Sequence, residues 1–211
     1  MKEFFKHENQ LFPSALSDNG KLHSCQKSQL ADILQSHVNL PETEPTDDTI
    51  IIDWSALIYA LPPSTARTFE DYANEKIIPR VQRYGAKYNR VYVIFDVYNK
   101  SSLKDEARVK KGKELRRRVT GTSKIPTKWK GFLRNDANKN ELFKFLADKI
   151  SAAETTSKVI VTKGEEAVSN SSHSLDGMPP CCHEEADTRI FVHARDAVNP
   201  RWERIPRNQG Q

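Results

Sequence analysis

Two aspartates in this sequence come at the point where an apolar run ends. Asp53 closes the run 49–53, and Asp96 comes directly after the run 91–95. Short β-branched runs of this kind are typical of strands that are buried on both faces. Parallel strands end at one edge of a sheet, which is where the sites of open α/β sheets form. We therefore expect Asp53 and Asp96 to lie near each other.

A third group of acids lies in segment 183–187, His-Glu-Glu-Ala-Asp, at the start of a predicted helix. Carboxylates gathered in one place repel each other, so they need cations or raised pKa values. Their hard oxygen atoms suit Mg²⁺ or Mn²⁺. One or two such ions can activate a water and stabilise the leaving oxygen on phosphorus. The acids therefore indicate metal-dependent chemistry on a phosphodiester.

Each acid also has an ordinary structural interpretation. An aspartate just after a strand is commonly a turn residue or the N-cap of the next helix. Acids in the first turn of a helix, such as those of segment 183–187, are favoured by the helix dipole. Taken one at a time, these residues leave both interpretations open.

Residues 100–139 form the most basic part of the chain, with fourteen Lys or Arg against four acids. Between about 103 and 118 the sequence favours a helix with almost no apolar face, which suits a surface that contacts phosphates. The candidate phosphate-binding residues are Lys104, Arg108, Lys110, Lys111, Lys113, Arg116, Arg117 and Arg118. The alternatives are a solvated surface or a nuclear-import signal. For Trp129 and Phe132 we predict core packing rather than base stacking.

The elements that must position these residues alternate along the chain. Hydrophobic periodicity predicts strands at 49–53, 91–95 and 159–162. It also predicts helices at 68–88, kinked at Pro79, and at 140–150 and 184–198. This alternation predicts an α/β fold, a three-layer α/β/α sandwich with a mainly parallel sheet.

Composition shifts divide the 211 residues into four parts. We predict a disordered tail at 1–26, then a helix with an acidic linker at 27–48. The domain itself spans 49–198, and a tail follows at 199–211. The net charge of +5 and the pI near 9.0 favour a polyanionic partner, here nucleic acid.

The three cysteines do not form a disulfide framework, because Cys181 and Cys182 are adjacent and Cys25 is far away. With His183 and His193 they fit no usual zinc spacing. We find neither a signal-peptide core nor an apolar run long enough to span a membrane. These features predict an intracellular protein that is not secreted and has no membrane partner. The basic run leaves a nuclear location open.

Three segments carry a family resemblance: IIIDWSALIYALPP, VYVIFDVYNKSSLKDEARVKKGKELRRR and CHEEADTRIFVHARDA. They resemble an uncharacterised animal family of PIN-like proteins, and the resemblance runs from about Lys27 to Val198. More distantly, the chain is similar to flap endonucleases. Asp53 would match their first-strand aspartate and Asp96 the aspartate of their F-D-G motif. Residues 185–187 would match their E-A-E motif, and residues 104–118 their basic helix.

The resemblance implies a metal-dependent nuclease that uses a metal-activated water on DNA or RNA. Its metal ligands, for one or two Mg²⁺ or Mn²⁺ ions, would be Asp53, Asp96, Glu185 and Asp187, with Glu184 as an outer-shell or alternative ligand. The same residues except Glu184 would be the catalytic set.

The chain departs from the resemblance at two places. Segment 199–211 lacks the D-x-D pair that ends the next strand of such proteins, and Val97 stands where they have Gly. The missing pair predicts a PIN-like domain truncated on its C-terminal side, with its last strand missing. The two departures leave a second hypothesis open, namely a catalytically inactive, nuclease-derived module that binds nucleic acid or protein, or a truncated remnant.

Overall fold

The computed structural model describes residues 17–19, 21–23, 27–37, 48–98, 115–170, 175, 180–181 and 186–198 of the chain. The chain divides into two compact units, Met1–Thr46 and Asp47–Gln211. Residues 199–211, predicted to be a tail without the last strand, lie outside the described residues.

The N-terminal unit contains a hairpin and one helix. Strand β1 (Ser17–Asp18) pairs antiparallel with β2 (Lys21–Leu22), and Asn19 between them has φ +49°. Residues 1–26 were predicted to be a disordered tail, although the sequence Asn-Gly at positions 19 and 20 is a strong signal for a tight hairpin. Helix α2 (Lys27–Ser36) lies within the segment 27–48, for which a helix followed by an acidic linker was predicted. Its Ile33 and Leu34 are each 58% exposed, so the described residues do not bury its apolar stripe.

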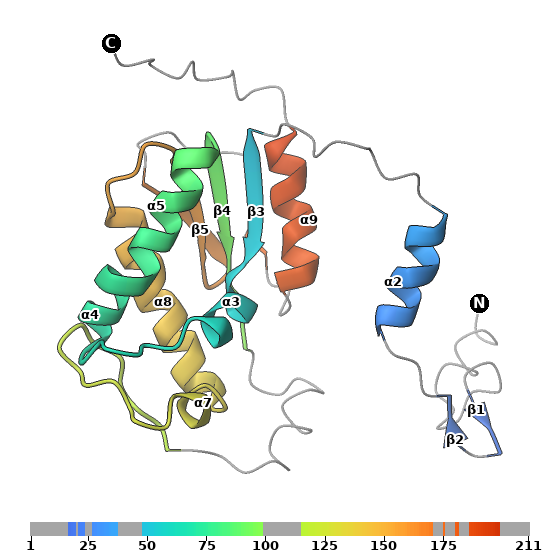
Figure 1. Cartoon of the computed structure of the whole chain (residues 1–211), viewed down its shortest axis with the longest axis horizontal. Coiled ribbons are helices and arrows are strands. Elements are labelled where there is room, and N and C mark those ends of the chain that lie inside the picture. The colour runs from blue at the N-terminus through green and yellow to red at the C-terminus, as the bar shows by residue number, and fades with distance from the viewer. Residues whose placement is uncertain are drawn as a thin grey trace. The chain divides into compact units, whose positions relative to one another are not determined.

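The second unit is built on a four-stranded sheet in the order β3-β4-β5-β6 (Figure 1). Strands β3 (Thr49–Asp53), β4 (Arg90–Ile94) and β5 (Lys158–Lys163) are parallel. Strand β6 (Glu166–Ser169) pairs antiparallel with β5. The prediction of an α/β fold with a mainly parallel sheet is confirmed.

Strand β6 was not predicted from the sequence. The turn before it consists of two residues, Gly164 and Glu165, between the paired Lys163 and Glu166. Gly164 has φ +64°, a conformation that a glycine in the first turn position of a hairpin adopts without strain. This turn sends the chain back along β5, so that β6 covers the free edge of β5 and becomes the last strand of the sheet.

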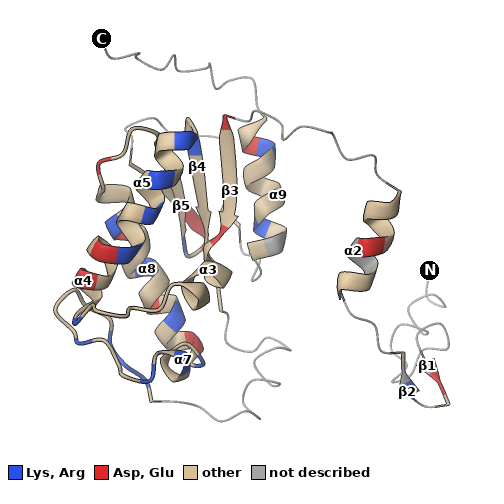
Figure 2. Ribbon diagram, viewed as in Figure 1, with Lys and Arg blue, Asp and Glu red and all other residues tan. Residues whose placement is uncertain are grey.

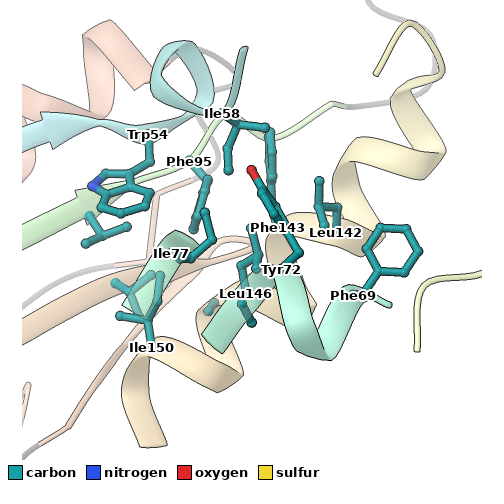
Figure 3. Close-up of a cluster of buried hydrophobic side chains, with 14 of the residues drawn as sticks. Trp54, Ile58, Phe69, Tyr72, Ile77, Phe95, Leu142, Phe143, Leu146 and Ile150 are labelled. Atoms are coloured by element: carbon teal, nitrogen blue, oxygen red, sulfur yellow. The ribbon is translucent and has the colours of Figure 1, made fainter. Parts of the chain in front are cut away.

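Helices pack on both faces of the sheet. The described helices of this unit are α3 (Trp54–Ala60), α4 (Phe69–Tyr72), η1 (Ala73–Ile77), α5 (Ile78–Lys87), α7 (Trp129–Phe132), α8 (Asp136–Ala152) and α9 (Ala186–Ala197). On one face, alternate strand residues such as Val93 and Val161 join the larger core. Figure 3 shows part of this core, with Leu142 and Leu146 of α8 labelled. On the other face Tyr92, Ile94 and Ile160 pack with Ala186 of α9. The arrangement is consistent with three layers.

The larger core is rich in aromatic side chains. Phe95 stacks on Phe143 with ring centroids 4.7 Å apart. Trp129 and Phe132 are 7% and 3% exposed, which confirms that they pack in the core. The contact between Phe95 and Phe143 ties helix α8 to the residue that follows β4.

The helix predicted at 68–88 is present but interrupted. Thr68 caps its start, and a π-helical turn, η1, separates α4 from α5 just before Pro79. Proline has no N–H for the regular i−4 hydrogen bond, so the backbone is irregular where a kink was predicted. The sequence analysis missed the short helices α3 and α7. It also placed the start of α8 four residues late, at Asn140 instead of Asp136.

Candidate functional site

Asp53 lies at the carboxyl edge of the sheet, as predicted. It is the last residue of β3, and the register of the two strands places it opposite Ile94 of β4. Its Oδ1 accepts a hydrogen bond of 3.1 Å from the amide of Ala56, so it is also the N-cap of α3. The structural interpretation of this aspartate as a helix cap therefore holds alongside its predicted position.

Asp96 lies two residues beyond Ile94 and is held from three directions. Its Oδ1 accepts a 2.7 Å hydrogen bond from the amide of Ala186, and its Oδ2 accepts one of 2.9 Å from the hydroxyl of Tyr98. Its own amide donates to the Ser55 hydroxyl at 2.7 Å. Because Ser55 follows Asp53 by two residues, the two aspartate-bearing segments are joined directly.

The contact with Ala186 brings the start of α9 to the same edge, because Ala186 is the first residue of that helix. Glu184 and Glu185 lie outside the described residues, as does the side chain of Asp187. The structure thus joins Asp53 and Asp96 to the backbone next to the predicted E-A-D acids. It leaves the ligand role of those acids as a prediction.

A pocket of about 350 Å³ opens beside Asp96. Its polar lining residues include Asp96, Asn140, Lys144, Thr162 and Glu165. Glu165 was missed by the sequence analysis, although it follows the third parallel strand as Asp53 and Asp96 follow the first two. Applying the same strand-end argument to β5 would have found it.

The side chains of helix α8 complete the pocket wall. The amide group of Asn140 accepts from the backbone N–H of Tyr98 at 3.1 Å and donates to the Tyr98 carbonyl at 2.8 Å. This pair of bonds fixes the backbone just after Asp96. Lys144 lies one turn further along α8, is exposed and lines the same pocket. The sequence analysis named neither residue, because helical spacing alone does not show which strand end a helix faces.

A buried arginine lies beneath this edge. Arg189 of α9 is 1% exposed, and its Nη1 donates to the Gly164 carbonyl at 2.6 Å. Burial lowers the pKa of Arg189, while the charges of Cys181, Asp96 and Glu165 oppose that shift. The guanidinium therefore offsets part of the negative charge that the carboxylates bring together.

The donor chemistry at this edge suits a hard divalent cation. The carboxylates of Asp53 and Asp96 each accept hydrogen bonds from the protein, yet a carboxylate has about four lone-pair sites and keeps some for a metal. Within the described ranges, however, no group of three or more His, Cys, Asp or Glu side chains is placed to hold an ion. A complete coordination shell would need the acids of segment 184–187.

The predicted basic region is only partly described. Residues 104–113, with Lys104, Arg108, Lys110, Lys111 and Lys113, lie outside the described residues. Arg116, Arg117 and Arg118 are exposed. Arg116 also forms an ion pair with Glu141, so part of its charge is used within the protein.

Asn138, which is fully buried, holds this basic segment against α8. Its Oδ1 accepts from the Arg117 amide at 2.8 Å, and its Nδ2 donates to the carbonyls of Leu115 and Phe132 at 3.1 and 3.2 Å. Figure 2 shows Lys and Arg residues along this segment on the side of the domain where the strands end. The described part of the basic segment, residues 115–118, thus lies on the same side as Asp53 and Asp96.

Among the helices that the structure describes, none is both long and apolar enough to cross a bilayer. Comparison of the chain with known protein families, with curated proteins and with solved structures gave no match. The site is therefore defined by its own geometry, as the acidic carboxyl edge of a mainly parallel α/β sheet with basic residues beside it.

Proposed function

We propose that this is a PIN-like, nuclease-type domain that hydrolyses phosphodiester bonds of DNA or RNA with Mg²⁺ or Mn²⁺, inside the cell. The observation that supports this proposal is the joining of three elements at one edge. Asp53 ends β3, Asp96 lies two residues beyond the neighbouring parallel strand β4, and Asp96 accepts a hydrogen bond from the first residue of α9. Sites of open α/β sheets form at this position.

In this proposal Asp53 and Asp96 hold the cation, together with Glu185 and Asp187 and with Glu184 as an outer-shell or alternative ligand. When bound, the ion would lower the pKa of a water and offset negative charge on the phosphoryl oxygens. The pocket next to Asp96 has a volume of about 350 Å³, which is within the usual range for small-ligand sites. Glu165 adds a further carboxylate at this pocket.

The other residues of the pocket would position the substrate. Lys144 would hold a phosphoryl oxygen beside Asp96, because an ammonium is a compact point charge for phosphate. Asn140 and Tyr98 would keep Asp96 in place through their hydrogen bonds. Arg117 and Arg118, exposed on the same side of the domain, would hold phosphates further along the strand.

A second function is a module that binds nucleic acid without cutting it. One observation agrees with this alternative. Among the residues the structure describes, no three metal-ligating side chains converge. The two aspartates also have structural duties as helix-capping acceptors, which would preserve them without catalysis.

Cleavage of end-labelled single-stranded and flapped DNA and RNA with Mn²⁺ tests the proposal. The key variant is Asp53→Asn, whose side-chain oxygen can still accept from Ala56 and keep the cap of α3. A matched control is Asp148→Asn, which removes an exposed carboxylate of α8 that pairs with Lys163.

Cutting by the wild type and the control, but not by Asp53→Asn or in EDTA, would support the nuclease. If the folded wild type binds these substrates and leaves all of them intact, the nuclease proposal is refuted and the protein is a binding module.

A further inference from the structure

A second hollow, of about 510 Å³, lies between α3 and the segment that carries α7. Its walls include Tyr59, Lys128, Trp129, Lys130 and Arg134. Apart from Tyr59 these residues lie within the basic stretch 100–139, but none is among the candidate phosphate-binding residues named from the sequence or in the carboxylate site.

The three cations of this hollow are exposed, and no ion pair is found for them among the described residues. Some other cations of the domain are paired. Lys149 pairs with Glu70 at 2.5 Å, and Lys139 pairs with Asp136 at 2.8 Å. The hollow therefore concentrates uncompensated positive charge, which favours an anionic ligand.

The base of the hollow is rigid. The Tyr59 hydroxyl donates to the Leu133 carbonyl at 3.3 Å, which ties α3 to the end of α7. Trp129 is buried, stacks on Phe132 with centroids 5.3 Å apart and meets Tyr72 edge-on at 5.2 Å. Because the cations project from a packed frame, the hollow exists before any ligand arrives.

The hollow also has a defined position relative to the carboxylates. Helix α3 begins directly after Asp53 and ends at Ala60, so Tyr59 is six residues from Asp53, or roughly 9 Å along a helix. Successive phosphates of one strand are spaced at roughly 3.4 Å along a B-form axis. The hollow therefore lies a few nucleotides from the proposed point of cleavage. Figure 1 places α3 and α7 on the side of the sheet where β3 and β4 end.

We propose that this hollow is a binding site for the sugar–phosphate backbone of a nucleic-acid strand that continues into the carboxylate site. The assignment to such a site rests on the proposed function. Lys128, Lys130 and Arg134 contact phosphates without reading bases, because long exposed side chains contact the backbone at any sequence. A polymer fits better than a small anion, since the charges are spread over an open surface rather than converging on one buried point.

The test measures binding separately from cleavage. The affinity of fluorescein-labelled single-stranded DNA and RNA oligonucleotides is measured by anisotropy in EDTA at several salt concentrations. The test variant carries Lys128→Gln, Lys130→Gln and Arg134→Gln together. The control carries Arg83→Gln, Lys87→Gln and Arg195→Gln, which removes three exposed cations near the start of β4 and the far end of α9.

We expect the test variant to bind at least tenfold more weakly, with a salt dependence reduced by two or three phosphate contacts. A variant that carries Lys128→Arg and Lys130→Arg, with Arg134 unchanged, keeps all three charges and should retain most of the wild-type affinity. The control should bind as the wild type does. Equal affinities of test variant and wild type would overturn the site, as would a wild type that binds neither oligonucleotide. If the test variant binds more weakly but the wild type cleaves no substrate, the binding site is supported and only the proposed nuclease activity is refuted.

Discussion

The Oδ1 atom of Asp96 accepts a 2.7 Å hydrogen bond from the amide of Ala186, although the two residues are 90 positions apart in the chain. An N-terminal amide of a helix has no partner within its own helix, so a carboxylate from another element can cap it. This bond fixes the start of α9 against the end of β4. It therefore holds the first residue of α9 at the carboxyl edge of the sheet.

Asp96→Asn should separate the structural duty of this carboxylate from its proposed metal binding. Asparagine keeps an oxygen that can accept from Ala186, so the melting temperature in EDTA should change little. The wild type should gain stability with millimolar Mn²⁺, by about 2.7 kcal/mol when the ion is at 100 times its Kd. Thermal unfolding with and without Mn²⁺ measures both. An identical Mn²⁺ shift in Asp96→Asn would contradict the assignment.

Lys144→Gln should slow cleavage while leaving stability unchanged. Lys144 lines the pocket next to Asp96, where its ammonium would stabilise charge on the phosphoryl group. Removing one such charge should lower kcat by roughly tenfold or more. Single-turnover cleavage assays measure the rate, with Arg83→Gln on α5 as the matched surface change. A Lys144→Gln variant as fast as the wild type would remove this residue from the reaction.

Asn138→Ala should destabilise the domain and release the basic segment. The side chain is fully buried and bonds to the backbone of Leu115, Arg117 and Phe132. Leaving those buried groups without partners should cost roughly 3 kcal/mol. Urea denaturation measures the loss, and limited proteolysis near residues 115–118 reports the release. The exposed Asn74→Ala is the control, and equal stability of the two variants would refute the anchor.

The buried His193 should make stability depend on pH below neutrality. Burial and the nearby Arg189 lower its pKa to about 4, while Asp196 acts in the opposite direction. The unfolded chain therefore binds this proton more readily than the folded protein does. The contribution of His193 is complete above its unfolded pKa of about 6.5 and is lost as the pH falls from there towards 4.

The expected loss of unfolding free energy from this group is on the order of 2–3 kcal/mol between pH 7 and pH 4. Urea denaturation of the wild type and of His193→Gln at several pH values measures it. The variant should show a shallower decline over this range. Parallel declines would mean that other groups control the acid sensitivity.

Local sequence patterns predicted most of the scaffold. The β-branched run of β3 and the apolar run of β5 were both found, with the strand ends correct to within one residue. Asp53 and Asp96 were placed at one sheet edge because each directly follows such a run. The interruption at η1 was anticipated only as a kink at Pro79.

The sequence by itself determined the alternation of strands and helices and the placing of Asp53 and Asp96 at the strand ends, because periodicity and β-branched runs are local properties. The tertiary structure alone decided that Glu165 and Lys144 share a pocket with Asp96 and that Arg189 lies beneath them. It also decided that β6 closes the sheet antiparallel and that α7 faces Tyr59 across a basic hollow. These relationships join residues far apart in the chain. They depend on strand order, register and the packing of helices on the sheet, which no local pattern specifies.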